Sequence, residues 1–220
     1  MYKLSNYLKI KIFILFFFGS QIYSFNEQNS TYHLKTIIFG AGCFWSVEKK
    51  FQETYGVVDV KSGYADGKNI EPSYKEIIKR KNRFNPNNYA EVVKVTYNSN
   101  KINLESLIKV FFEIHDPTQL NRQGNDIGVQ YRSLILTSTE EEIFLANKIK
   151  DQYQNLLIKE GYGLIKTDIK NLTNFYLAEN YHQDYLEKNP NGYCPDYSTG
   201  VVFSKKPEKL TDNRNLVTGK

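Results

Sequence analysis

The sequence contains few side chains able to bind a metal ion. Its 220 residues include two cysteines, Cys43 and Cys194, and three histidines. The histidines are scattered, so no set of ligands has the close spacing of a zinc site. The sequence therefore indicates no metal centre, and it also excludes a relay of thiols through a third cysteine.

Clusters of basic residues are lacking as well. The formal net charge is +5, but Lys3, Lys9 and Lys11 belong to the first 24 residues, which contain no acidic residue. Without that segment, 26 basic residues stand against 24 acidic ones. No stretch of Lys and Arg interleaved with aromatic residues remains, so the composition argues against a nucleic-acid-binding protein.

The sequence also lacks an apolar run long enough to cross a bilayer comfortably. Residues 12–18 are all apolar, but such a run is too short for a transmembrane helix. Lysines precede it and the small residues Gly19, Ser20 and Ser24 follow it, which is typical of a secretory signal peptide. We expect residues 1–24 to be cleaved and the protein to be exported, to the periplasm, the exterior or the lumen of the secretory pathway. An uncleaved membrane anchor is the alternative.

The remaining chain is long enough to bury one hydrophobic core without metals or several disulfides. We expect one domain over residues 25–203, followed by a flexible polar tail over residues 204–220, and we see no internal repeat. Hydrophobic periodicity predicts strands at 34–39, 57–64, 89–97, 133–136 and 165–169, and helices at 46–55, 103–115, 140–157 and 175–188. Strands and helices are interspersed without strict alternation, which favours an α+β fold, a two-layer α/β sandwich, over a Rossmann fold or a barrel.

One stretch places a cysteine where a nucleophile is activated. The β-prone residues 36–39 run into glycines at 40 and 42, and Cys43 follows at the start of an amphipathic helix. Unpaired backbone N–H groups at a helix N-terminus favour the thiolate over the thiol. Phe44 and Trp45 come next and would wall the sulfur with aromatic surface. The alternative is a buried Cys43 that acts only as a small apolar residue.

A carboxylate is expected on an apolar strand face. In the strand predicted at 89–97, Glu91 alternates in phase with Val93, Val95 and Tyr97. Burial on that face would raise the pKa of Glu91 and make it a proton donor near neutral pH. The alternative is that Glu91 lies at the strand end and reaches solvent.

Three other features lie between the predicted elements. Residues 79–88 are rich in Lys, Arg and Asn and are predicted to be a surface loop. His115 ends the apolar stripe of its helix and is interpreted as a packed or capping residue rather than a catalyst. The long polar connection at 116–131 is typical of a functional loop, and we expect it to form the second wall of a site.

Short motifs spread over residues 36–195 together resemble the A class of the peptide methionine sulfoxide reductase family. Each motif alone is weak evidence, but the ordered set is specific. In chain order the motifs are Gly42-Cys-Phe-Trp45, Gly63-Tyr64, Pro72-Ser-Tyr74, Ala90-Glu91, His115-Asp-Pro-Thr-Gln119, Asn121-Arg-Gln-Gly-Asn-Asp126, Gln130-Tyr-Arg-Ser133, Ala178-Glu-Asn-Tyr-His-Gln183 and Asn191-Gly-Tyr-Cys194.

The resemblance implies a ferredoxin-like core and an enzyme that returns methionine S-sulfoxide, free or in oxidised proteins, to methionine. It implies that Cys43 is the nucleophile and that Glu91 protonates the sulfoxide oxygen. The residues that it implies for substrate binding are Phe44 and Trp45 against the methyl group, Tyr74 and Tyr131 as hydrogen-bond donors, and Asp126 as the carboxylate that orders the site.

The resemblance also implies a use for the second cysteine. Cys194 corresponds to a resolving cysteine that condenses with the sulfenic acid of Cys43 to form a redox-active disulfide. A thioredoxin-like dithiol would then reduce that disulfide from outside, with no bound cofactor. The expected role is protein repair under oxidative stress, by a chain that we take to be a monomer.

The sequence departs from the family pattern in ways that leave other functions open. Tyr89 stands where histidine is common, Leu120 stands where glycine is usual, and the loop at 79–88 is extra. The alternatives are a thiol peroxidase, which also forms a sulfenic acid, and a disulfide-stapled exported binding domain. A cysteine hydrolase is less favoured, because neither His115 nor His182 belongs to a Cys-His-Asn pattern.

Overall fold

The computed structural model describes residues 33–68 and 71–203. The predicted signal peptide at 1–24 and the predicted tail at 204–220 lie outside the described residues. Within the described ranges, no helix is long and apolar enough to cross a membrane.

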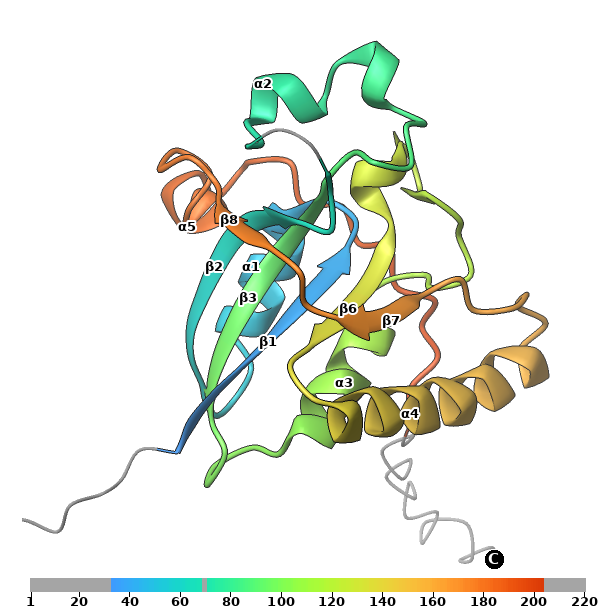
Figure 1. The fold of residues 1–220 in the computed structure, drawn as a ribbon. Helices are drawn as coiled ribbons and strands as arrows, with labels where there is room; N and C mark the ends of the chain where they lie inside the picture. The colour runs from blue at the N-terminus through green and yellow to red at the C-terminus, as the bar shows by residue number, and fades with distance from the viewer. Residues whose placement is uncertain (1–32, 69–70, 204–220) are drawn as a thin grey trace, which may run out of the picture. The chain divides into compact units, whose positions relative to one another are not determined.

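A six-stranded sheet forms the centre of the domain, in the order β7-β6-β1-β3-β2-β8 (Figure 1). Neighbouring strands are antiparallel except for β6 and β7, which are parallel. The strands are β1 (Leu34–Ala41), β2 (Val57–Ala65), β3 (Ala90–Asn98), β6 (Ser133–Thr137), β7 (Asp168–Asn171) and β8 (Phe175–Leu177). Together with the helices, this sheet confirms the predicted α+β sandwich.

The helices begin and end close to the predicted positions, apart from the last. They are α1 (Phe44–Gln52), α2 (Tyr74–Ile77), α3 (Leu104–Glu113), α4 (Glu140–Lys159) and α5 (Tyr185–Lys188), with short 3₁₀ helices η1 (Arg80–Asn82) and η2 (Val129–Tyr131). Side-chain caps start the two long helices: Asn103 accepts from the backbone N–H of Ser106 in α3, and Thr139 accepts from that of Glu142 in α4. A small hairpin, β4 (Arg122–Gln123) and β5 (Asp126–Ile127), lies in the long polar connection.

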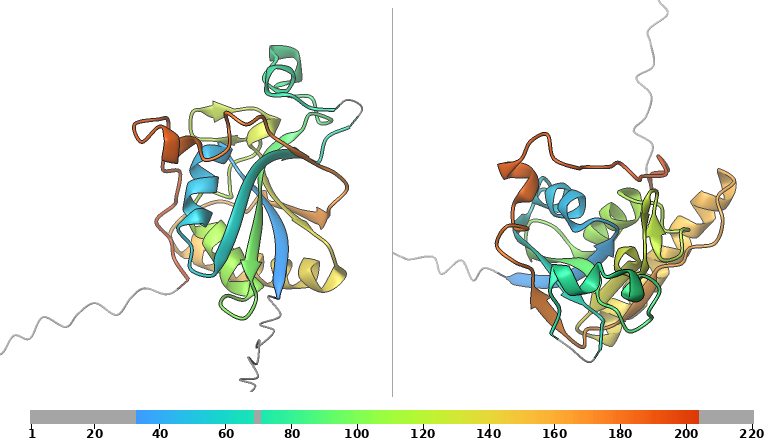
Figure 2. Two further views of the ribbon diagram at one scale, coloured as in Figure 1. Left: turned by 90° about the vertical axis from the view of Figure 1, so that its left-hand side faces the viewer. Right: turned by 90° about the horizontal axis from the view of Figure 1, so that it is seen from above.

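The main core lies between one face of the sheet and helices α1, α3 and α4 (Figure 2). Phe39 of β1 stacks on Phe51 of α1 and on Phe111 of α3, with ring centroids 4.9 and 5.0 Å apart. Val93 and Val95 of β3 belong to this core, whereas alternate β3 residues belong to a smaller cluster on the opposite face. The predicted strand alternation is therefore confirmed, and it directs residue 91 toward the helices.

The helix predicted at 175–188 is wrong. Residues 175–177 form strand β8 instead, which pairs antiparallel with β2, and only residues 185–188 are helical. Pairing with the sheet edge outweighs the helical pattern, because it satisfies the backbone of an otherwise open strand. The buried side chain of Gln183 then bonds to both backbone groups of Ser62, at 3.1 and 2.9 Å, which holds this segment against β2.

Candidate active site

Cys43 lies at the junction between β1 and α1, as its N-cap residue. Gly42 makes this junction possible, because its φ of +93° is a conformation that favours glycine, and a Cβ there would lie 2.8 Å from the Gln123 side chain. The chain thus turns sharply from the sheet into the helix. This turn places the sulfur beside the backbone N–H groups of the first helical turn.

A pocket of about 120 Å³ opens over Cys43. It brings together seven of the eight residues expected at the site, and the complete lining is Cys43, Phe44, Trp45, Tyr74, Glu91, Asp126, Tyr131 and Tyr193. Cys194 is the one expected residue that does not line it. Both cysteines are free thiols, Cys43 buried and Cys194 exposed.

The environment of Cys43 favours the thiol form. Its side chain is only 6% exposed, and burial, followed by the nearby Glu91 carboxylate, raises the pKa of Cys43. Hydrogen bonding by the N–H groups of Trp45 and Ser46 opposes this rise but does not overcome it. The helix N-terminus thus favours the thiolate, as expected, but burial outweighs this effect and favours the thiol in the free protein. The aromatic wall that was expected to shield the sulfur also removes it from water.

Glu91 lies at the start of β3 and points into the core, with 2% of its surface exposed. It accepts one hydrogen bond, 3.2 Å long, from the backbone N–H of Phe44. Burial raises the pKa of Glu91 to about 8, against the lowering effect of that hydrogen bond. The expected position on the apolar face is confirmed, and near neutral pH this group is a carboxylic acid with a proton to donate.

Two phenols face the pocket from different elements. Tyr74 is the first residue of α2 and Tyr131 the last of η2, and both line the cavity with Glu91. Burial raises the pKa of Tyr74 to about 12 and also raises that of Tyr131. Both side chains are therefore neutral at physiological pH and can donate an O–H hydrogen bond.

Asp126 closes the pocket from hairpin strand β5. Its carboxylate accepts hydrogen bonds from Tyr193 at 3.2 Å and from Tyr197 at 3.0 Å, and the two tyrosine hydroxyls lie 2.6 Å apart. Partial burial raises the pKa of Asp126, while the two phenols lower it. The residues that flank Cys194 are thereby held at the pocket.

Sequence reasoning missed four residues that support the pocket. They are Tyr193 and Tyr197, described above, Glu179, which accepts from the backbone N–H of Tyr74 at 2.9 Å, and His182, which accepts from the indole of Trp45 at 3.1 Å. Tyr193, Glu179 and His182 lie within the motifs that carried the family resemblance. The motifs were the available signal, but their contacts depend on tertiary structure.

Two other residues behave as structural groups. His115 is fully buried between the Phe111 carbonyl and the Ser133 hydroxyl, at 2.7 and 2.8 Å, and burial lowers its pKa to about 4. It is packed, as expected, and it does not line the pocket over Cys43. Tyr89 packs edge-on against Tyr176 and makes no hydrogen bond to Glu91 among the described residues.

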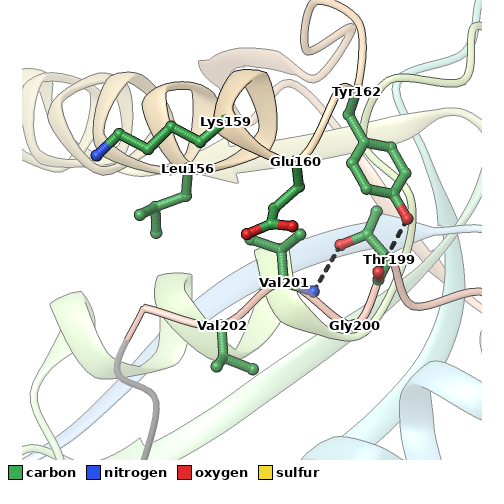
Figure 3. Close-up of a pocket in the computed structure, with 8 residues that line it drawn as sticks. All are labelled: Leu156, Lys159, Glu160, Tyr162, Thr199, Gly200, Val201 and Val202. Carbon is green, nitrogen blue, oxygen red and sulfur yellow. Dashed lines mark hydrogen bonds between the residues drawn. The ribbon is translucent and has the colours of Figure 1, made fainter.

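A larger cavity, of about 340 Å³, lies between the end of α4 and residues 199–202 (Figure 3). Lys159 and Glu160 are its only charged lining residues, and it contains no cysteine or histidine. Across the described ranges, no group of three or more His, Cys, Asp or Glu side chains is placed to hold a metal ion.

Comparison with known proteins gives one family. The profile described as "Peptide methionine sulfoxide reductase" matches residues 35–213. A peptide methionine sulfoxide reductase MsrA of Corynebacterium kroppenstedtii is 45% identical over 173 residues, which cover 76% of each chain. The mitochondrial peptide methionine sulfoxide reductase of Bos taurus is 48% identical over 164 residues, 74% of this chain and 68% of the bovine one.

Solved structures agree with these sequence matches. Methionine sulfoxide reductase A of Corynebacterium diphtheriae superposes with a TM-score of 0.68 at 40% identity, covering 77% of this chain and 82% of the other. Reduced Mxr1 from Saccharomyces cerevisiae gives a TM-score of 0.67 at 39% identity, covering 77% and 92%.

The buried carboxyl of Glu91 makes stability depend on pH. Its folded-state pKa is raised from 4.5 to about 8, so ionisation destabilises the fold increasingly as pH rises through that range. We expect the free energy of unfolding of Glu91→Gln to rise relative to that of the wild type as the pH is raised from 5 to 8. The rise should be at most about 1.4 kcal/mol for each pH unit. Urea unfolding at the two pH values measures this gain.

Glu105→Gln is the matched control, because Glu105 is a surface residue of α3 whose pKa lies below 4.5. Its effect should be the same at both pH values. A pH-independent effect of Glu91→Gln would contradict the raised pKa.

Proposed function

The chain belongs to the peptide methionine sulfoxide reductase family, and we propose how its own residues carry out that family's reduction of methionine sulfoxide to methionine. One observation supports the proposal above the others: a buried thiol, a protonated carboxyl group and two neutral phenols line a single small pocket with Phe44 and Trp45. A sulfoxide needs these three kinds of contact, namely a nucleophile, acid groups at oxygen and apolar surface at the methyl group.

The pocket orients the sulfoxide by its three unlike substituents. The methyl group packs on Phe44 and Trp45, the oxygen faces Glu91 and the phenols, and the remaining chain leads out of the cavity. Sulfoxide sulfur is a stereocentre, so exchanging two substituents would turn the oxygen toward the aromatic wall. This arrangement supports selection of one epimer, which we propose to be the S sulfoxide.

Proton transfer accompanies the attack. Glu91 donates its proton to the sulfoxide oxygen, which makes that oxygen a leaving group, and the Cys43 sulfur attacks the substrate sulfur. The proton of the Cys43 thiol returns to the Glu91 carboxylate, so that neither group has to remain charged in the apolar pocket. Tyr74 and Tyr131 donate hydrogen bonds to the oxygen as charge develops. The attack forms an S–S bond, and the hydroxyl group then passes from the substrate sulfur to the Cys43 sulfur as that S–S bond breaks. The products are methionine and a Cys43 sulfenic acid.

Cys194 then resolves the sulfenic acid. Its thiol attacks the Cys43 sulfur, a disulfide forms and water leaves. Downstream, residues 199–203 are fixed, because Tyr162 donates to the Thr199 carbonyl at 2.9 Å and Tyr153 to the Val201 carbonyl at 2.8 Å; Figure 3 shows the first of these bonds. Upstream, the chain is fixed by α5. We therefore place the required movement in residues 190–198, with release of Tyr193 and Tyr197 from Asp126.

The disulfide is then reduced from outside. Cys194 is exposed in the thiol form, which supports a thioredoxin-like dithiol as the reductant, since exchange requires access to a disulfide sulfur. We propose that oxidised proteins and free methionine sulfoxide are the substrates and that the role is protein repair.

Variants of the two cysteines are expected to stop the reaction at different steps. Cys43→Ser abolishes methionine release, whereas Cys194→Ser releases about one methionine per protein and then stops in the presence of thioredoxin. The measurement follows methionine released from separate S and R sulfoxide substrates. Activity of Cys43→Ser at the wild-type level would disprove its role as nucleophile, and unimpaired cycling of Cys194→Ser would disprove its role as resolver. Turnover of peroxide but not sulfoxide would favour a thiol peroxidase.

Glu91 is expected to act on the rate of chemistry more than on substrate binding. Loss of a positioned general acid commonly costs roughly 100-fold or more in rate, so Glu91→Gln should lower kcat far more than it raises KM. In the wild type, kcat should fall as pH rises above about 8, where Glu91 loses its proton. Steady-state kinetics from pH 6 to pH 10 measures both effects, with Glu105→Gln as the control. Equal changes in kcat and KM would contradict this role.

We propose, from the leader-like residues 1–24, that the protein is exported and processed. N-terminal sequencing of the protein purified from its native host should find a new terminus near residue 25. An intact Met1 would contradict cleavage, and recovery in the cytosolic fraction would contradict export.

A further inference from the structure

A second hollow adjoins the catalytic pocket. Its volume is about 380 Å³, and it shares Tyr74, Asp126 and Tyr131 with the pocket over Cys43. The hollow is therefore next to the place that we propose for the sulfoxide, and a residue that flanks the oxidised methionine can reach it. We refer to this hollow as the side groove.

The loop at 79–88 supplies one wall of the side groove through Arg80 and Arg83. This loop is attached to the opposite wall in two places: the Arg83 carbonyl accepts from the backbone N–H of Val129, and Arg83 Nε donates to the Ile127 carbonyl, both at 2.8 Å. Within the loop, the buried Asn88 side chain donates to the Ile77 carbonyl at 2.9 Å. The extra residues thus form a fixed wall of the side groove, which the prediction of a surface loop did not include.

The two arginines have no carboxylate partner in the part of the chain that the structure describes. No Asp or Glu oxygen there lies within 4.0 Å of either guanidinium. The neighbouring Glu76 pairs with Lys79, and Asp126, the acidic residue of the groove, is occupied by Tyr193 and Tyr197. Within the described residues, two guanidinium groups without a carboxylate partner therefore line the groove; that of Arg83 also donates to the Ile127 carbonyl and lies 5.5 Å from the centroid of the Phe84 ring.

A second observation also points to a ligand. Gln130 lines the groove and is only 5% exposed, yet its carboxamide oxygen has no hydrogen-bond partner among the described residues. Buried polar atoms are normally paired, because an unpaired one costs free energy. This oxygen lies beside Gly128, so pairing it with an N–H group of a chain in the groove requires a rotation of the carboxamide.

We propose that the side groove is a specificity subsite that binds an acidic side chain next to the oxidised methionine in a protein substrate. Arg80 and Arg83 pair with the carboxylate of a neighbouring Asp or Glu, and Gln130 accepts from the peptide backbone. The inference rests on the proposed function, since it needs the sulfoxide to sit over Cys43. A residue adds about 3.3 Å of extended chain, which suits a flanking residue to a groove that adjoins the pocket.

The test compares two peptides that carry the same methionine S-sulfoxide and differ only in flanking residues, Glu in one and Gln in the other. Exposed ion pairs contribute up to about 1 kcal/mol each, so the wild type should prefer the Glu peptide by about fivefold in kcat/KM at low salt. High salt should reduce this preference, because it screens exposed charges.

Variants distinguish an effect of the side groove on peptide preference from an effect of the general surface charge. Arg80→Gln together with Arg83→Gln should bring the preference close to one, and Arg80→Gln alone should lower it while keeping the Arg83 bond to Ile127 that holds the loop. Lys81→Gln is the matched control, because Lys81 belongs to the same turn but lines a different cavity. It should keep the preference.

The outcomes distinguish the subsite from the function. Equal rates on the two peptides in the wild type, or a preference that survives in the double variant, would overturn the subsite and leave the reductase intact. No reduction of either peptide would overturn both. A parallel comparison of N-acetylmethionine sulfoxide with its methyl amide tests whether the arginines bind a main-chain carboxylate instead. If the arginines cause a preference for the free acid over the amide but no preference for the Glu peptide over the Gln peptide, the subsite is also overturned.

Discussion

The side chain of Glu91 lies in the core between β3 and α1 and accepts a hydrogen bond from the Phe44 N–H, at the first turn of the helix that follows Cys43. The arrangement of the pocket depends on this contact, because it joins the sheet to the start of α1. Burial keeps the carboxyl protonated near neutral pH. The same burial makes ionisation costly for the fold, so the group that we propose as the acid is also a source of instability at high pH.

The low polarity of the pocket raises the pKa of both groups that we propose to react. Burial raises the pKa of Cys43 as well as that of Glu91, so the free site holds two protonated groups. A thiolate beside a carboxylate would place two negative charges in an apolar cavity. The proton exchange that we propose avoids that state, and it fits a helix N-terminus that positions a sulfur without ionising it in the free protein.

The residues around the pocket differ in how firmly they are held. Cys43 and Glu91 belong to the sheet and its first helix, which are packed on the core, whereas Asp126 and Tyr193 come from connecting segments. The proposed nucleophile and acid thus belong to regular elements of the fold, while the segment that carries Cys194 is held at Asp126 through Tyr193 and Tyr197. The loop at 79–88 adds two arginines to the wall of the side groove, which adjoins the pocket.

The sequence by itself determined the fold class, most of the helices and strands, and seven of the residues that line the pocket. Local periodicity put Glu91 in phase with the apolar face of its strand, because strand alternation is a short-range property, but the tertiary structure decided that it is buried there rather than exposed at the strand end. Only the tertiary structure decided the state of Cys43, since its pKa depends on burial by residues distant in the chain. The same is true of residues 175–177, where a free sheet edge outweighed a helical pattern, and of the side groove, whose walls are brought together by contacts between the 79–88 loop and residues 127–129. In each case the deciding free energy comes from contacts between distant residues, which local sequence patterns do not encode.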